Sequence, residues 1–556
     1  MKSFLVRFGI VLAVVVVVNL LSSFLFFRVD LTQEGRYTLS EATENLLANL
    51  DDDVHVNVYL TGNLPPGFKR LETSIRETLA EFQARAGQTL TYRFIDPTAN
   101  PNEKQRTEFQ TQLLQKGLTP TNLNFTAEGN QRTEQLIYPW AIVSYKGREL
   151  PVLLLRGNRS SSPEEQLNQS IENVEYELAS AIRRLTIREK KVLGVTVSYT
   201  DVEPLRMSDL LATLQEFYDI KLIDLQASRD LVGLDGLIVP KPDRPFSEAD
   251  KYKIDQFVVN GGKALFFVDG LRIDSIGREG TYAQPLNLNL NDLFFRWGIR
   301  LNNDIIKDLS CAFIPLNVGN MGDKPNVQLL PWRFFPLINN FGGAANHKSP
   351  IVRNLDAIYS RFTSTLDTVQ APGITKTPLL LSSQYTKILK APALVSYNEA
   401  RQQPDPRTYD SGVQLIACLL EGRFQSLYTN RILPGDPRAA SFKAQGQPSK
   451  IVVCSDGDLL INDINYRTNT PYPLGYERFS KNTFANKDFV VNAVNYLLDD
   501  NGIIGARTRQ VTLRPLDKIR LREERLSWQL LNLLGPVLLV GFVGVVWQFA
   551  RRRKYA

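Results

Sequence analysis

Two long apolar stretches, one near each end of the chain, constrain its architecture more than any other feature of the 556 residues. The first lies between Arg7 and Arg28 and contains 20 residues without a charged side chain. The second lies between Arg525 and Arg551 and contains 25 such residues. A helix of 20 residues is about 30 Å long, which is the thickness of the hydrocarbon core of a bilayer. The sequence therefore predicts one transmembrane helix in each stretch.

Further features distinguish these stretches from a cleaved signal peptide and from a buried core helix. Trp528 and Trp547 are 19 positions apart, roughly 28 Å along a helix, which places them at the two interfaces of a membrane. The first stretch is not followed by the small-x-small pattern that signal peptidase requires. We therefore expect transmembrane helices at residues 1–28 and 528–550.

The net charge of +7 is concentrated at the two ends. Residues 1–28 carry three cations and no acid, residues 551–554 carry four cations, and residues 29–527 have no net charge. A neutral body of this size lacks the electrostatic signature of a nucleic-acid-binding protein. Under the positive-inside rule both termini are cytoplasmic, so the body is predicted to lie in the periplasm of a bacterium and to be anchored in the inner membrane.

The body alternates strand and helix patterns, which is typical of an α/β protein. The first domain, 29–188, has the order strand, helix, strand, helix, strand, strand, helix, which resembles a thioredoxin-like layout. Residues 61–67 stand where a thioredoxin carries its redox cysteines, and they contain none. The second domain, 189–500, is expected to hold a parallel sheet with an irregular insertion near 271–375. A charged juxtamembrane segment, 501–527, and a basic tail, 551–556, complete the chain.

The expected elements follow from hydrophobic periodicity and from helix-capping signals. Strands are expected at 54–60, 90–95, 122–126, 140–146, 149–155, 192–198, 220–225, 236–239, 264–268, 378–381 and 451–454, and helices at 68–86, 103–116, 163–187, 207–218, 412–422, 488–498 and 516–526. A further helix begins at Ser247, whose side chain is an N-cap with Asp250 in a variant of the capping box, and it ends at Gly261-Gly262.

The sequence offers one constellation for nucleophilic catalysis. Cys454 ends an apolar strand, and a cysteine in that place is a nucleophile if His347 and a carboxylate meet it. A small buried residue at a strand end is the more common explanation. Asp456 and Asp458 follow, and they are interpreted as a solvated turn in preference to a cation site. Cys311, Cys418 and Cys454 are too far apart to indicate a disulfide scaffold or a redox pair.

Other motifs point away from catalysis. Gly261-Gly262-Lys263-Ala264 is the nearest approach to a phosphate-binding loop, and it lacks the spacing and the hydroxyl residue. The only histidines are His55 and His347, which give no metal-ligand spacing. The pairs Glu164-Glu165 and Glu523-Glu524 are expected on solvated helix surfaces. We therefore predict no catalytic, cofactor-binding or metal-binding residues and a protein that is not an enzyme.

Several segments together resemble a known family. They are Asp30-Leu31-Thr32 with Arg36–Ser40, Tyr59-Leu60 with Pro66–Leu71, Phe94–Pro97, Pro245–Glu248 running to Asn260–Lys263, and the tail Arg551–Ala556. In this order they are similar to the gliding-motility-associated ABC transporter substrate-binding, or auxiliary, protein of Bacteroidota.

The resemblance implies a periplasmic protein that is anchored at both ends and works with a multi-spanning permease and a separate cytoplasmic ATPase. It also implies that the second domain has a flavodoxin- or glutamine-amidotransferase-like fold without demonstrated activity. Members often carry a Gly-His-Gly-Glu turn where this chain has residues 198–203, and the histidine is absent here. The leading hypothesis is an accessory subunit that couples the transporter to a ligand or to an envelope component. A solute-binding protein and an amidotransferase-like enzyme using Cys454 are the alternatives.

Overall fold

The structure is a computed structural model of the full chain. It describes residues 38–126, 132–156, 162–187, 189–273, 275–322, 324–341, 349–432, 440–499, 502–508 and 524–555. Residues up to Gln510 form one compact unit, and residues from Val511 onward form a second. The predicted first span, 1–28, and most of the charged segment 501–527 lie outside the described residues, as does His347.

The N-terminal module, residues 38–187, is built on a four-stranded sheet with the order β2-β1-β5-β6. Strand β1 is parallel to β2 and antiparallel to β5, and β5 is antiparallel to β6. The elements are α2 Glu41–Ala48, β1 Val54–Val58, α3 Pro66–Ala86, β2 Leu90–Phe94, α4 Glu103–Gln115, β3 Thr121–Thr126, β4 Arg132–Ile137, β5 Trp140–Tyr145, β6 Arg148–Leu153 and α5 Pro163–Thr186.

Alternation along β1 decides which face of this sheet is covered. Val54, Val56 and Val58 are fully buried and share one cluster with residues of α3 and α5, so both helices lie on that face. His55 projects from the other face, where it is exposed. The predicted elements of this module are found within a few residues. Two further elements were not predicted, namely helix α2 and strand β4, which pairs with β3 in a hairpin.

The central module, residues 190–499, contains a nine-stranded sheet with the order β13-β18-β22-β23-β10-β9-β7-β8, in which β19 also pairs with β22. The five strands β8, β7, β9, β10 and β23 are parallel. Their bounds are β7 Val192–Thr196, β8 Asp219–Ile223, β9 Gly236–Pro240, β10 Lys263–Phe267 and β23 Ser449–Cys454, and the antiparallel strands are β13 Ile299–Leu301, β18 Leu366–Thr368, β19 Ile374–Leu381 and β22 Leu415–Gly422.

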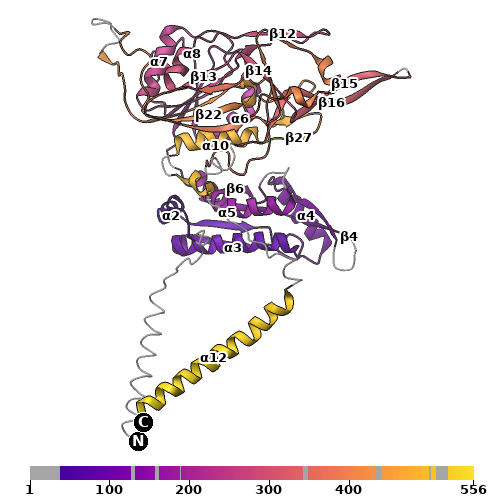
Figure 1. The fold of residues 1–556 in the computed structure, drawn as a ribbon, viewed down its shortest axis with the longest axis vertical. Coiled ribbons are helices and arrows are strands. Elements are labelled where there is room, and N and C mark those ends of the chain that lie inside the picture. Colours follow the sequence, from indigo (N-terminus) through magenta and orange to yellow (C-terminus); the bar gives the residue numbers. More distant parts are fainter. Residues whose placement is uncertain are drawn as a thin grey trace. The chain divides into compact units, whose positions relative to one another are not determined.

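Helices cover both faces of this sheet. Helices α6 (Ser208–Gln215) and α10 (Asn486–Leu498) share one apolar cluster with one set of alternating strand residues. Helices α7 (Glu248–Val259) and α8 (Asn291–Trp297) share another cluster with the intervening strand residues. The central module therefore has three layers, with the parallel strands buried in the middle (Figure 1).

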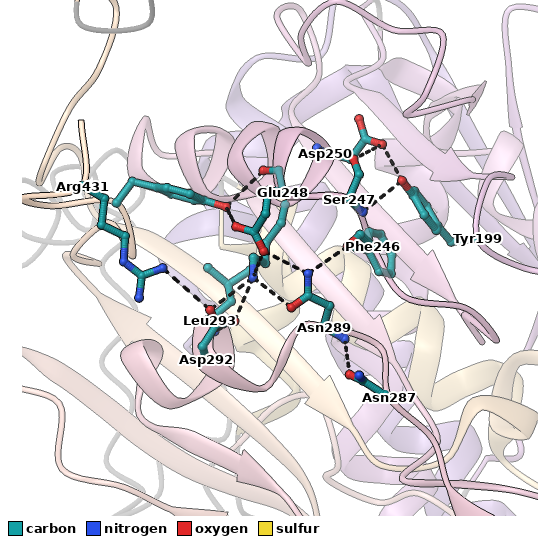
Figure 2. A network of polar contacts seen from close by, with 12 residues as sticks. Tyr199, Phe246, Ser247, Glu248, Asp250, Asn287, Asn289, Asp292, Leu293 and Arg431 are labelled. Atoms are coloured by element: carbon teal, nitrogen blue, oxygen red, sulfur yellow. Dashed lines mark hydrogen bonds and ion pairs between the residues drawn. The ribbon is translucent and has the colours of Figure 1, made fainter. Parts of the chain in front are cut away.

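Helix α7 begins at the predicted N-cap. The Ser247 hydroxyl accepts a hydrogen bond from the Asp250 amide over 3.1 Å, as the sequence indicates. The return contact of the capping box differs, because the Ser247 amide donates to the hydroxyl of Tyr199 over 3.2 Å, and that hydroxyl donates to Asp250 over 2.6 Å. The Phe246 ring stacks on the Tyr199 ring with centroids 4.2 Å apart (Figure 2).

A buried lysine joins α7 to α8 in the same network. The Lys251 side chain is 1% exposed, and its ammonium lies 2.7 Å from Glu248 and 3.1 Å from Asp292. It also donates to the side-chain oxygen of Asn289 over 3.2 Å. Figure 2 shows Glu248, Asn289 and Asp292 converging from α7 and from the start of α8.

Two predictions for the central module are wrong. Residues 412–422, predicted to be a helix, form strand β22, which lies between β23 and β19. Residues 416–420 are all buried, and a continuous apolar run that is buried on both faces has no periodicity to distinguish a strand from a helix.

The stretch 271–375, predicted to be irregular, is rich in strands and supplies β13 and β18 to the main sheet. It also contains β11 Leu271–Arg272, β12 Thr281–Pro285, β14 Asp304–Asp308, β15 Cys311–Met321, β16 Lys324–Ile338 and β17 Ile358–Tyr359, and the sheet partners that follow are β20 Thr386–Lys390 and β21 Ala393–Val395. Strands β15 and β16 form a long hairpin that projects from the module (Figure 1). Four two-residue strands lie between β23 and α10, namely β24 Ile464–Asn465, β25 Thr470–Pro471, β26 Tyr476–Glu477 and β27 Asn482–Thr483.

The described part of the second unit is formed by helix α12, Arg525–Tyr555. Its segment Arg525–Arg553 has a mean hydropathy of 2.2 and is long and apolar enough to cross a membrane. None of that segment is buried against other parts of the chain, which is the condition of a helix whose apolar surface requires a lipid environment. Within the described residues it is the one helix of this kind.

Candidate functional site

The carboxyl ends of the parallel strands of the central module meet at one edge of the sheet. In the order β8-β7-β9-β10-β23, the first strand of the module, β7, lies between the second and the third. The helix after β7 therefore packs on one face of the sheet and the helix after β9 packs on the other. In open α/β sheets, ligands bind outside the carboxyl ends of strands at such a point. A cavity of about 610 Å³ opens here, lined by residues that follow β7, β9, β10 and β23.

Lys241, which follows β9, is the centre of a cluster of charged groups. Its ammonium lies 2.5 Å from Asp458 and 3.4 Å from Asp269, which follow β23 and β10. The Gly457 amide donates to Asp269 over 2.7 Å. A Cβ at Gly457 would lie 2.6 Å from the Lys241 side chain, so this turn requires glycine to bring the three strand ends together.

Asp456 lies beneath this cluster and has no exposed surface. Its carboxylate accepts hydrogen bonds from the Arg361 amide and the Asp458 amide, both over 2.8 Å, and from the Thr363 hydroxyl over 3.3 Å. Burial, with the nearby charges of Asp458 and Asp269, raises the pKa of Asp456 to about 8. Burial also raises the pKa of Asp269.

Asp458 titrates in the opposite direction. Burial alone would raise its pKa, but the charges of Lys241 and Arg361 hold the pKa of Asp458 below its usual value. The interpretation of Asp456 and Asp458 as a solvated turn is therefore wrong. Both carboxyl groups are held inside the cluster, one neutral near pH 7 and the other ionised.

Arg361 closes the cavity from the segment between β17 and β18. Its guanidinium forms two hydrogen bonds to Asp463, of 2.9 and 3.2 Å, and lies 4.9 Å from the centre of the Tyr359 ring. Arg206 approaches the same Asp463 at 3.9 Å. Two cations therefore share one carboxylate on this wall.

Three residues at this edge adopt left-handed backbone angles although they are not glycine. Their φ values are 65° at Tyr199, 38° at Lys241 and 52° at Phe362. Such angles cost free energy and are concentrated at functional sites. The Lys241 carbonyl accepts from the Thr200 hydroxyl over 2.8 Å, and the Asp243 amide donates to the Tyr199 carbonyl over 2.8 Å. The strained turns after β7 and β9 are thus held against each other.

The cavity is lined by charged side chains, and each of the cations named here forms an ion pair with a carboxylate. Arg244 pairs with Asp243 over 2.8 Å and with Asp201, which stands in the turn after β7. Lys241, Arg206 and Arg361 each have a carboxylate partner, as described above. Among the described residues, no group of histidine, cysteine and carboxylate side chains is arranged to hold a metal ion.

Cys454 is fully buried at the end of β23 and packs in the core between the sheet and α10. Burial raises the pKa of the Cys454 thiol well above its usual value, so the reactive thiolate is disfavoured. Burial likewise raises the pKa of Cys311 and of Cys418 to about 12. His347, the histidine expected to meet Cys454 in the catalytic alternative, lies outside the described residues.

The remaining residues singled out in the sequence have structural roles. The segment Gly261–Lys263 ends α7 and starts β10, and the Lys263 ammonium donates to the Gly261 carbonyl over 2.7 Å. Glu164 and Glu165 lie exposed in the first turn of α5. The imidazole of His55 is within 2.6 Å of the Thr91 hydroxyl, and both side chains are exposed.

Sequence reasoning missed Lys241, Asp269 and Arg361. A signal for the first two was present, since the apolar strands 236–240 and 263–267 are followed by Lys-Pro-Asp and Val-Asp-Gly, as β23 is followed by Ser-Asp-Gly-Asp. Charged residues that follow adjacent parallel strands meet at one edge. Arg361 gave no such signal, because it comes from the stretch predicted to be irregular.

Comparisons with known proteins agree with a two-module chain. A family model described as "ABC-type uncharacterized transport system" matches residues 190–493, and a model for a domain of unknown function, DUF7088, matches residues 33–144. An uncharacterized protein of Borreliella burgdorferi is 23% identical over 417 residues, which are 74% of this chain and 75% of that protein.

Two solved structures show a weaker likeness. The N-terminal domain of mmIFT52 is 13% identical with a TM-score of 0.29, covering 56% of this chain and 98% of that one. A putative ThuA-like protein from Parabacteroides merdae is 11% identical with a TM-score of 0.27, covering 59% of this chain and 94% of that one. TM-scores this low do not establish a shared fold.

Proposed function

Because the chain belongs to the family described as an ABC-type uncharacterized transport system, whose model matches more than half of it, we propose that it is a non-catalytic accessory subunit of an ABC-type transporter. The match over residues 190–493 is the observation that carries the proposal. The absence of a phosphate-binding loop from the sequence agrees with it, because ATP hydrolysis then belongs to a separate subunit. Its partners are a multi-spanning permease and a cytoplasmic ATPase.

The proposed subunit is anchored in the bacterial inner membrane at both ends. Helix α12 supports the second anchor, since none of the described residues buries its apolar segment. The uncharged stretch between Arg7 and Arg28 supplies the first. With the cations of residues 551–554 in the cytoplasm, both modules lie in the periplasm.

We favour a coupling role over solute capture and over catalysis. The strand order of the N-terminal module supports a thioredoxin-like ancestry, and the 2-1-3-4-5 order of the central module is the one found in flavodoxin-like folds. An amidotransferase-like enzyme would need a reactive Cys454, whereas this thiol is buried. The association with gliding motility stays a prediction of the sequence resemblance.

Extraction of the full chain in mild detergent, followed by identification of the co-purifying subunits, tests the proposal. We expect a permease and an ATPase to be recovered with the chain in constant ratio. The matched control replaces residues 526–550 by an unrelated transmembrane helix of equal length, which keeps the anchor and shows whether α12 itself contacts the permease. Recovery of the intact chain without any transporter subunit would refute the accessory role.

A further inference from the structure

A second cavity, of about 460 Å³, lies between the two modules. Helix α5 of the N-terminal module forms one wall, and helices α6 and α10 with residues 354–356 of the central module form the other. Arg507, from the short helix η7 (Ile503–Thr508) that follows the central module, also lines it. We refer to this cavity as the inter-module cleft. Its volume is within the range of small-ligand sites, about 300–1,000 Å³, and such sites favour domain interfaces.

The acidic side chains of the inter-module cleft are already engaged. Glu216, the residue that follows α6, forms an ion pair with Arg184 of α5. Arg156 lies 3.6 Å from both Glu177 and Asp488, which come from the two opposing walls. These pairs link the two modules. The remaining carboxylate of the lining, Asp356, accepts a hydrogen bond from the Ala357 amide over 2.8 Å.

Arg507 is a cation of the inter-module cleft that takes part in none of these ion pairs. The residue is 6% exposed, and its two terminal nitrogens donate to the Asn492 side chain over 3.1 Å and to the Arg353 carbonyl over 2.6 Å. Its guanidinium lies 5.0 Å from the centre of the Tyr176 ring. Its Nε–H has no acceptor, and no carboxylate of the described residues forms an ion pair with it. Buried charges in proteins are normally paired, so a buried guanidinium with neutral partners requires explanation.

Further polar atoms in the same cleft are also without partners. The side-chain oxygen of Asn173, a residue that is 2% exposed, accepts no hydrogen bond. The Nε atoms of Arg156 and Arg184 form no hydrogen bond either, although that of Arg156 lies 3.6 Å from Glu177. Unpaired buried polar atoms are rare in folded proteins, and a bound water, ion or ligand group that satisfies them is one explanation. Here three donors and one acceptor line one cavity.

We propose that the inter-module cleft binds a small ligand through an oxyanion group, a carboxylate or a phosphate, with Arg507 as its counter-charge. A guanidinium offers paired N–H donors that match either group. Asn173 accepts a hydrogen bond from a donor elsewhere on the ligand. The ligand thereby contacts α5, α10 and η7 at once, so that its binding stabilises the closed arrangement of the two modules. This site is separate from the cavity at Lys241 and goes beyond the accessory role proposed above.

Isothermal titration calorimetry on the full chain in detergent tests the site, with inorganic phosphate and acetate as separate probes at matched ionic strength and chloride as the background anion. We expect saturable binding of at least one probe. Binding of phosphate alone identifies a phosphate-bearing ligand, and binding of acetate alone identifies a carboxylate. Binding of neither probe overturns the proposal, whether or not transporter subunits co-purify.

Variants assign the binding to Arg507. Arg507→Gln removes the charge and is expected to abolish the binding heat. Arg333→Gln is the matched control, because Arg333 is also buried, at 4% exposed, and donates to the Glu399 carbonyl away from the cleft; it should bind as the parent chain does. Should Arg507→Gln fail to fold, Asn173→Asp places a negative charge in the cleft and should weaken binding at least about tenfold. Unchanged affinity in either cleft variant would refute the assignment.

Discussion

Asp456 combines complete burial with three hydrogen bonds from protein donors, and its neighbours decide its protonation. The ordinary pKa of an aspartate is near 3.9, whereas burial and the charges of Asp458 and Asp269 raise the pKa of Asp456 to about 8 in the native protein. Between these two values the native state binds one proton more than the unfolded state. Its contribution to stability is therefore present at low pH and is lost as the pH rises toward 8.

Replacement of Asp456 by asparagine should remove this dependence. We expect the parent chain to lose stability from pH 5 to pH 8 with a slope of up to about 1.4 kcal/mol per pH unit from this group, and Asp456→Asn to lack that slope. Urea denaturation followed by tryptophan fluorescence is the measurement, since Trp297 and Trp332 are buried in the same module.

Asp458→Asn is the control of opposite sign. The native pKa of Asp458 is held low, with Lys241 and Arg361 offsetting the effect of burial, so its carboxylate stabilises the native state above the ordinary pKa and ceases to do so as the pH falls through the native value. This variant should be destabilised at pH 7 and should approach the parent chain at low pH. Parallel pH profiles for the parent chain and Asp456→Asn would contradict the assignment of the proton.

The sequence led to some of these residues but not to their arrangement. Cys454 and Asp456 were recognisable as a strand end and the turn after it, and burial of the thiol was the more common expectation. That Asp456 is enclosed could not be predicted, because Arg361 and Thr363 reach it from more than 90 positions away in the chain. Long-range contacts of this kind leave no local periodicity in a single sequence.

The segment Pro245–Glu248, one of those that carry the family resemblance, has a structural role at the start of helix α7. Ser247 caps the helix, Phe246 stacks on Tyr199, and Glu248 accepts from the Tyr428 hydroxyl over 3.0 Å and pairs with Lys251. The hydrogen bond from Lys251 holds the pKa of Glu248 below its usual value. The motif fixes the start of α7 against the turn after β7, which carries part of the Lys241 cavity.

Loss of the cap should loosen this helix selectively. Ser247→Ala removes the acceptor for the Asp250 amide and should destabilise the first turn of α7 by about 1 kcal/mol, the usual cost of losing an N-cap side chain. Hydrogen–deuterium exchange of peptides covering 246–259 should then be several-fold faster, while peptides from α3 are unchanged. Ser247→Thr keeps the hydroxyl and should restore protection; equal exchange in Ser247→Ala and the parent chain would contradict the role of the cap.

Elements with strong periodicity or clear capping signals were predictable, and those buried on both faces were not. Helices α3 and α7 begin and end within a few residues of the expected positions, because Gly87 and Gly261 end them. Strand β22 was predicted to be a helix for lack of any alternation in its apolar run. Strands β13 and β14 pair with β18 and β20, which lie more than 60 positions away in the chain, and the local composition of asparagine, proline and glycine in 271–375 suggested loops instead.

The order of the strands in the two sheets also required the structure. Alternating strands and helices predict an α/β chain with parallel strands, and the structure is a mixed α/β protein. Periodicity alone did not show that β22 and β18 extend the parallel sheet in antiparallel orientation. It also gave no sign that Ile503 and Ile504, which follow the central module in the chain, belong to the apolar core of the N-terminal module.

A chain with two membrane anchors and a chain with one are expected to behave differently when either end is deleted. If residues 1–28 and α12 both cross the membrane, deletion of 525–556 should leave the protein in the membrane pellet after alkaline carbonate extraction, because the first stretch still buries about 20 apolar residues in lipid. Deletion of 1–28 alone should have the same result, and only the double deletion should release the two modules. Release by deletion of 525–556 alone would mean that the first stretch is not a span. In that case the N-terminal module would be held at the membrane only through η7 and α12, and the cations at the start of the chain would not set its orientation.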